Sequence, residues 1–328
     1  MTQRMKIHLP NSAYLQNLQG FLRQCSGENP ERLDFSMHDS WVSVHPAVLA
    51  MTACAAALVR HNGGTINGKS EAHPALAYLI RMGLFEFLGI DPGRIIQPRD
   101  PAGRFIALTQ IRTSADLPAT LADLVPLLHA GRLEQDSIRY VFSELGRNAL
   151  EHSQSPVGAI LCAQYYKRTN TVSIGIADAG IGIRRTITHS HQARTATEAI
   201  ALALQPGITG TTARLGGTET NAGAGLFFVK SIAALSRNFF VLYSEDTMFK
   251  LLRGSQTGAV TLHADPREDT HLFAANLPSW TGTVVGIDIR MEAGQQFTSF
   301  LAAIRHAYTA KTTNRQRKQY FKRIRFLK

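Results

Sequence analysis

The sequence contains, in this order, the stretches Glu144-Leu145-Gly146-Arg147-Asn148-Ala149-Leu150-Glu151-His152, Asp178-Ala179-Gly180-Ile181-Gly182 and Asn221-Ala222-Gly223-Ala224-Gly225-Leu226. Each stretch alone also fits a plain helix edge or turn. Their order within fewer than a hundred residues is more specific than any one of them. Together they indicate a ligand pocket, and the residue types of each stretch indicate its chemistry.

The first stretch belongs to a helix that the spacing of apolar residues predicts over 137–153. Glu144, Asn148 and Glu151 follow one another at i, i+4 and i+7 along one side of it. The amide oxygen of Asn148 is a neutral ligand suited to Mg²⁺. The carboxylate of Glu144 is suited to hold or deprotonate a water or hydroxyl that attacks a terminal phosphate. A solvated helix edge would show the same residues, so both interpretations stay open.

The second stretch follows two predicted strands, 158–164 and 171–178, which a turn at 167–170 joins. Asp178 stands at the end of the second strand, where its carboxylate can accept a hydrogen bond from an exocyclic amine such as that of adenine. Gly180 and Gly182 let the backbone turn tightly and approach a ring. A plain turn is the alternative.

The third stretch precedes a predicted helix over 226–236. Glycines at the start of a helix let its free N–H groups face an anion, which suits Gly223 and Gly225. The segment before them, 184–220, is long and rich in Thr, Gly and Ala, with one helix predicted over 193–204. Within it, the Thr- and Gly-rich composition of residues 207–217 is typical of a mobile segment.

The order Glu-x-x-x-Asn, Asp-x-Gly-x-Gly and Gly-x-Gly-Leu resembles the GHKL superfamily of histidine kinases, gyrase-type ATPases, Hsp90 and anti-sigma-factor kinases. The resemblance implies an ATP pocket in which Asn148 binds Mg²⁺ and Glu144 is the catalytic acid. It implies that 184–220 is the ATP lid, and that Trp280-Thr281-Gly282-Thr283-Val284-Val285-Gly286-Ile287 corresponds to the family's late Gly-Thr strand. The ATP-contacting residues that it implies are Asn148, Asp178, Gly180, Gly182, Gly223, Gly225, Leu226 and Thr283.

Within that superfamily, Asn148-Ala149-x-x-His152 is most similar to the anti-sigma-factor Ser/Thr kinases. Glu151 stands where histidine kinases often carry Lys, which argues against a sensor kinase. The resemblance therefore implies transfer of phosphate from Mg-ATP to a Ser or Thr of a regulatory partner protein. Two alternatives stay open: an ATP-gated switch with slow hydrolysis, and a non-catalytic ATP-dependent binding module. His152 is either a ligand on the phosphate side or a helix cap.

The N-terminal hundred residues alternate short strands and helices, which predicts a small α/β unit. Its order resembles a STAS-like domain, the fold of anti-sigma-factor antagonists. Ser43 is the residue nearest to that family's phosphoacceptor, but a Ser before a helix is also an ordinary N-cap. The predicted strands are 6–9, 32–37 and 65–67, and the predicted helices are 12–25, 45–60 and 74–88.

We therefore expect an α+β chain with three parts. Residues 1–112 would form the STAS-like α/β domain. Residues 113–292 would form a GHKL ATPase domain with the Bergerat fold, an α/β sandwich whose mixed sheet is covered on one face by helices. Residues 293–328 would form an amphipathic helix and a basic tail.

The net charge of +11 is largely a property of the tail, because residues 311–328 carry eight Lys or Arg and no acid, and the other 310 residues carry +3. This tail could bind nucleic acid or an acidic surface, or pack on its own domain with its charges solvated. The three cysteines, Cys25, Cys54 and Cys162, form no metal or disulfide pattern. With no apolar run long enough to span a bilayer, we expect a cytoplasmic protein. A homodimer is left open.

Overall fold

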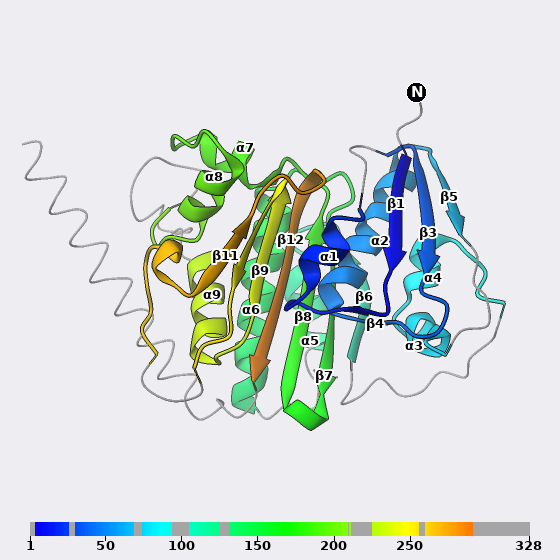
Figure 1. Ribbon diagram of the computed structural model, residues 1–328, viewed down its shortest axis with the longest axis horizontal. Helices are drawn as coiled ribbons and strands as arrows, with labels where there is room; N and C mark the ends of the chain where they lie inside the picture. Colours follow the sequence, from blue (N-terminus) through cyan, green and yellow to red (C-terminus); the bar gives the residue numbers. More distant parts are fainter. Residues whose placement is uncertain are drawn as a thin grey trace, which may run out of the picture.

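The protein is described from a computed structural model, which covers residues 4–25, 30–68, 74–93, 105–124, 132–208, 210, 225–255 and 260–290. The fold is α+β, as expected. A seven-stranded sheet occupies the middle of the molecule, a three-stranded sheet lies at one end, and α7 (Gly182–Thr188) and α8 (Ala196–Ala203) lie at the other (Figure 1). The C-terminal residues 291–328, and with them the predicted basic tail, lie outside the described residues.

The large sheet has the strand order β11-β10-β9-β12-β8-β7-β6, and every neighbouring pair in it is antiparallel. The expectation of a mixed sheet was therefore wrong. Short connections explain the difference, because β7 and β8 are joined by a one-turn 3-10 helix and β9 and β10 by a single residue. The strands are β6 (Phe105–Ile111), β7 (Ala159–Tyr166), β8 (Thr171–Asp178), β9 (Phe240–Glu245), β10 (Thr247–Leu251), β11 (His271–Ala274) and β12 (Trp280–Arg290).

One face of this sheet packs against α6 (Arg132–Glu151) and α9 (Gly225–Leu235), with α5 (Leu117–Leu124) alongside α6. Alternate residues of β8 point to this face, and Val172, Ile174 and Ile176 are buried in its core together with Phe142 of α6. The predicted period of α6 is confirmed, since its apolar stripe supplies the helix side of the core.

The opposite face is covered by α2 (Pro46–His61), a helix of the N-terminal part, so the sheet has helices on both faces. Small residues make this approach possible. A side chain at Gly175 of β8 would collide with the backbone of Pro46 and Ala47, and one at Gly286 would press on Leu15 and Ala47. Thirteen of the sixteen residues of α2 are buried, because its other side packs on the N-terminal sheet. The helix is thus shared by both sheets.

The N-terminal sheet is parallel, in the order β1-β3-β5, with β1 (Arg4–Leu9), β3 (Arg32–Met37) and β5 (Thr65–Gly68) where strands are predicted. Two predicted helices differ. Only α1 (Leu18–Leu22) forms within 12–25, after the short strand β2 (Ser12–Ala13), which pairs with β4 (Ser43–Val44). Gly83, with φ +76°, divides the helix predicted over 74–88 into α3 (Leu76–Arg81) and α4 (Leu84–Leu88).

Strand β6 joins the two parts of the molecule. It pairs with β7 at the edge of the large sheet, and the N–H of Leu108 donates to the carbonyl of Met82 at 3.0 Å. Residues 105–111 precede the boundary expected at 112/113, yet they complete the C-terminal sheet. Among the helices of the described ranges, none has the length and apolar character needed to cross a membrane.

Candidate functional site

A pocket opens on the α6 and α9 side of the large sheet, at the end of β8. Six helices and strands meet there: α6, β8, α7, α8, α9 and β12. The space between its walls measures about 950 Å³, including the part open to solvent. Of the predicted site residues, the pocket brings together Glu144, Asn148, Asp178, Gly182, Gly225, Leu226 and Thr283.

Helix α6 presents two of these residues to the pocket, Glu144 and Asn148, one turn apart. Burial raises the pKa of Glu144 above its usual range, and the guanidinium of Arg147 opposes that shift. Arg147 also lines the pocket, and its Nη1 lies 3.4 Å from Oε1 of Glu144. Glu151, the third residue of the predicted row, is exposed and does not line the pocket.

Asn148 supplies the clearest sign that the pocket receives a polar ligand. Its Nδ2 is buried and has no hydrogen-bond partner within the described part of the chain. A buried amide without a partner costs about 1–3 kcal/mol, so such a group commonly faces a ligand or water. Because an amide presents either its nitrogen or its oxygen after a flip, the Asn148 side chain also fits a metal ligand.

The donor set fits Mg²⁺ only if a ligand brings oxygens of its own. The described residues contain no cluster of three His, Cys, Asp or Glu side chains that could hold a metal ion. Mg²⁺ commonly uses one or two protein oxygens together with phosphate oxygens and waters. Asn148 and Glu144 meet that requirement when a polyphosphate supplies the rest.

Asp178 ends β8 at the inner wall of the pocket and is 3% exposed. Burial raises the pKa of its carboxyl to about 7, against the lowering effect of hydrogen bonds from the backbone of Gly180 and Thr283. The N–H of Gly180 donates to Oδ1 at 2.9 Å, and the indole Nε1 of Trp280 donates to the main-chain carbonyl of Asp178 at 3.0 Å. The position of Asp178 is therefore fixed from both its backbone and its side chain.

The two glycines after Asp178 have different roles. A side chain at Gly180 would collide with the carbonyl oxygen of Ser153, and the next residue, Ile181, donates its N–H to that same oxygen at 2.7 Å. Gly182 has φ +77°, a conformation that costs other residues energy. Gly182 lines the pocket, whereas Gly180 acts behind it by letting the turn lie against the end of α6.

The third stretch is described only from Gly225 onward, and Gly223 lies outside the described residues. A side chain at Gly225 would come within 2.5 Å of Oε2 of Glu144, so the start of α9 lies directly beside that carboxylate. Leu226 follows on the pocket wall. Within the predicted lid, α7 and α8 are ordered elements, and α7 was not predicted.

Sequence reasoning missed the apolar wall of the pocket. It comes from Ile183, Thr186 and Ile187 of α7, Ala203 of α8, and Ile208. Ser244 of β9 holds α7 in place, because its Oγ accepts the N–H of Ile183 at 3.0 Å and donates to the carbonyl of Gly282 at 2.7 Å. Ile183 and Ile187, four positions apart, were the available signal for α7.

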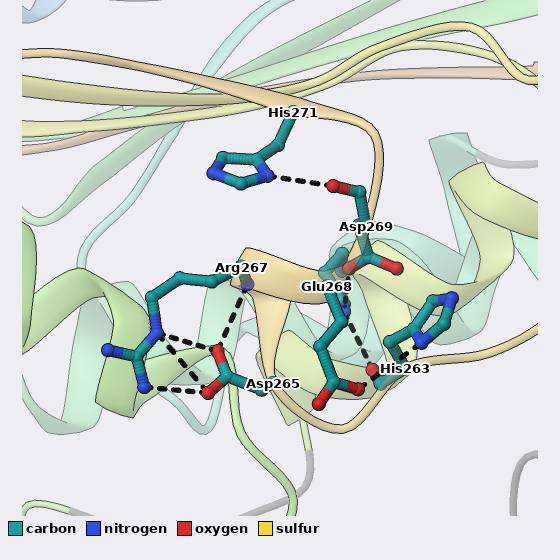
Figure 2. A network of polar contacts seen from close by, with 7 residues as sticks. His263, Asp265, Arg267, Glu268, Asp269 and His271 are labelled. Atoms are coloured by element: carbon teal, nitrogen blue, oxygen red, sulfur yellow. Dashed lines mark hydrogen bonds and ion pairs between the residues drawn. The ribbon is translucent and has the colours of Figure 1, made fainter.

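Helix α9 is anchored behind the pocket by an ion pair between Lys230 and Asp269. Both side chains are buried, and Lys230 also donates to the carbonyl of His263 at 3.0 Å. Figure 2 shows the loop that carries Asp269, which further contacts hold together: Arg267 with Asp265, Glu268 with His263, and His271 with the Asp269 carbonyl. The ion pair thus fixes α9 to the loop that precedes β11.

Two other candidates resolve differently. His152 lines the pocket, and burial lowers its pKa. Ser43 does not cap α2: His45 does, with its Nδ1 accepting the N–H of Ala47 at 3.0 Å. The hydroxyl of Ser43 instead lies 2.6 Å from that of Tyr14. The three cysteines are buried and free.

Comparison with models of known protein families gives no match for this chain. A search of curated proteins also gives no match.

Proposed function

We propose that this protein binds Mg-ATP in the pocket between α6, α9 and β8, and transfers the γ-phosphate to a Ser or Thr of a regulatory partner protein. The observation that carries the proposal is the meeting of Glu144, Asn148, Asp178, Gly225 and Thr283 in one pocket. These residues come from the three short stretches and from the late strand at 280–287, and their convergence in one pocket supports a shared ligand. The proposal includes the resemblance to the GHKL superfamily and its Bergerat fold, with a STAS-like N-terminal part.

The pocket offers each part of ATP a suitable surface. The carboxylate of Asp178 can accept a hydrogen bond from the adenine amine, and the apolar wall of α7 and Ile208 suits the ring. The start of α9 at Gly225 and the amide of Asn148 face the phosphate side, beside Glu144. Mg²⁺, when bound with the nucleotide, would neutralise charge on the phosphates.

In the reaction, the residues of this chain mainly position groups. Glu144 has a raised pKa and lies at the phosphate side of the pocket, so it is suited to accept the proton of an attacking hydroxyl or water. Asn148 and the N-terminus of α9 orient the phosphate chain. Closing of the pocket around the nucleotide would exclude bulk water.

The test is incubation of the full chain with γ-labelled ATP and Mg²⁺, alone and with candidate partners, beside Asn148→Ala. Label on a partner's Ser or Thr, absent with the variant, supports the kinase. Absence of any ATP binding by the wild type would refute the proposal.

A second function, an ATP-gated switch with slow hydrolysis, is favoured by one observation. Helix α2 of the N-terminal part packs on β8, the strand that ends at Asp178. A ligand that moves the end of β8 would therefore act on the N-terminal part directly. Phosphate release by the protein alone, lost in Glu144→Ala, would support this function in place of the kinase.

A further inference from the structure

Arg147 is the one arginine or lysine that lines the pocket within the described residues. It follows Glu144 by three positions on α6 and precedes Asn148 directly. Two carboxyl groups also line the pocket, Glu144 of α6 and Asp178 of β8. Among the described residues, a polyphosphate entering this pocket therefore meets two acids and a single permanent cation, so the position of Arg147 matters for its binding.

The guanidinium of Arg147 is free to change partners. Its contact with Glu144 is long, at 3.4 Å, and among the described residues it is its only polar contact. The side chain remains 45% exposed, and a guanidinium has five N–H donors. An exposed pair of this kind is worth only about 0–1 kcal/mol, so exchange for a stronger anion is cheap.

We propose that Arg147 leaves the Glu144 carboxylate when a nucleotide binds and takes the phosphate chain, so that it selects phosphorylated adenine nucleotides over adenosine. This inference rests on the proposed function and adds to it a specificity-determining residue. Two parallel N–H···O bonds from a guanidinium match phosphate oxygens better than any single donor. The exchange also frees Glu144 to face the attacking group.

The experiment measures binding of adenosine, ADP and ATP, each with Mg²⁺, to the full chain by titration calorimetry. We expect Arg147→Gln to weaken ATP and ADP binding roughly tenfold or more while adenosine binding stays within about twofold. Arg139→Gln is the matched control, because Arg139 is an exposed residue two turns earlier on the same helix and does not line the pocket. It should leave all three affinities unchanged.

Arg147→Lys is the second variant. A lysine keeps the charge without the planar fork, so its ratio of ATP to adenosine affinity should fall between those of the wild type and Arg147→Gln. If Arg147→Gln weakened adenosine and ATP binding equally, or did not weaken ATP binding, the inference would be overturned. The proposal that the wild type binds ATP would still stand. Failure of the wild type to bind any of the three would refute the proposed function itself.

Discussion

Nε2 of the buried His45 lies 3.2 Å from Oδ1 of Asp288, although 243 residues separate them in the sequence. Since Nδ1 of His45 accepts the N–H of Ala47, Nε2 carries the hydrogen and donates to Asp288. The hydroxyl of Ser173 donates to the same carboxylate oxygen. One histidine thus caps α2 and fastens it to β12 and β8 of the large sheet.

We expect His45→Ala to destabilise the protein by roughly 2–3 kcal/mol, because it removes a helix cap and leaves Asp288 with one donor fewer. Urea unfolding measures this, and a double-mutant cycle with Asp288→Asn should show coupling between the two positions. His61→Ala, an exposed change in the last turn of the same helix, should stay within about 0.5 kcal/mol. Equal effects of both histidine substitutions would contradict the assigned role.

We expect Lys230→Met to destabilise the protein by about 3–5 kcal/mol, because it leaves the Asp269 carboxylate buried without its cation. The double change Lys230→Met with Asp269→Leu should recover most of that loss, since no charge then remains buried. Thermal unfolding of the two variants gives the comparison, with Lys167→Met in the exposed turn after β7 as the control. A double variant no more stable than Lys230→Met would argue against the pair.

We expect Gly180→Ala to destabilise the protein by roughly 1–3 kcal/mol, because its methyl group would collide with the main-chain oxygen of Ser153. Gly20→Ala is the matched substitution. Gly20 is exposed in helix α1 with open space around it, so alanine there should stabilise by about 0.4–1 kcal/mol. Chemical unfolding measures the change in unfolding free energy for both variants. Changes of opposite sign would confirm the close approach of Gly180 to Ser153, and changes of the same sign would exclude it.

The raised pKa of Asp178 predicts a pH dependence of stability in the unliganded protein. The carboxyl titrates at about 7 when folded and at about 3.9 when unfolded. Below pH 4 the Asp178 carboxyl is protonated in both the folded and the unfolded state, so its contribution to stability is fully present. Between pH 4 and 7 the folded state binds more protons, so stability falls as pH rises, by roughly 4 kcal/mol in all, and levels off above 7.

Asp178→Asn isolates this effect, because an amide does not titrate. The unfolding free energy of the wild type minus that of the variant should fall steadily from pH 4 to pH 7. A difference that does not vary over that range would show that Asp178 titrates at its ordinary pKa.

Local patterns predicted the individual elements well and the long-range pairing poorly. The spacing of apolar residues located α6 and β8, because each buries one regular face or runs through the core. The pairing of β6 with β7 could not be predicted from the sequence, because the residues of a strand do not determine which strand lies beside it in the sheet.

The sequence of α2 contains a signal for its burial on both sides. Residues 46–59 include no charged side chain, and a helix that is apolar all round is buried on every side. For the pocket, the short stretches located residues whose chemistry is distinctive, such as Asn148 and Asp178. The apolar wall of α7 went unpredicted, because isoleucine in a pocket and isoleucine in a core look the same in a sequence.

The position of β6 and α2 limits how this molecule can be divided. A fragment starting at residue 113 would keep every pocket residue that the structure describes, but it would expose β7 as a bare edge and uncover Ile160 and Cys162, which are buried together with α2. Such a fragment would tend to aggregate or pair with another chain. A fragment that is to keep the pocket in a stable fold must therefore also contain residues 46–61 and 105–111.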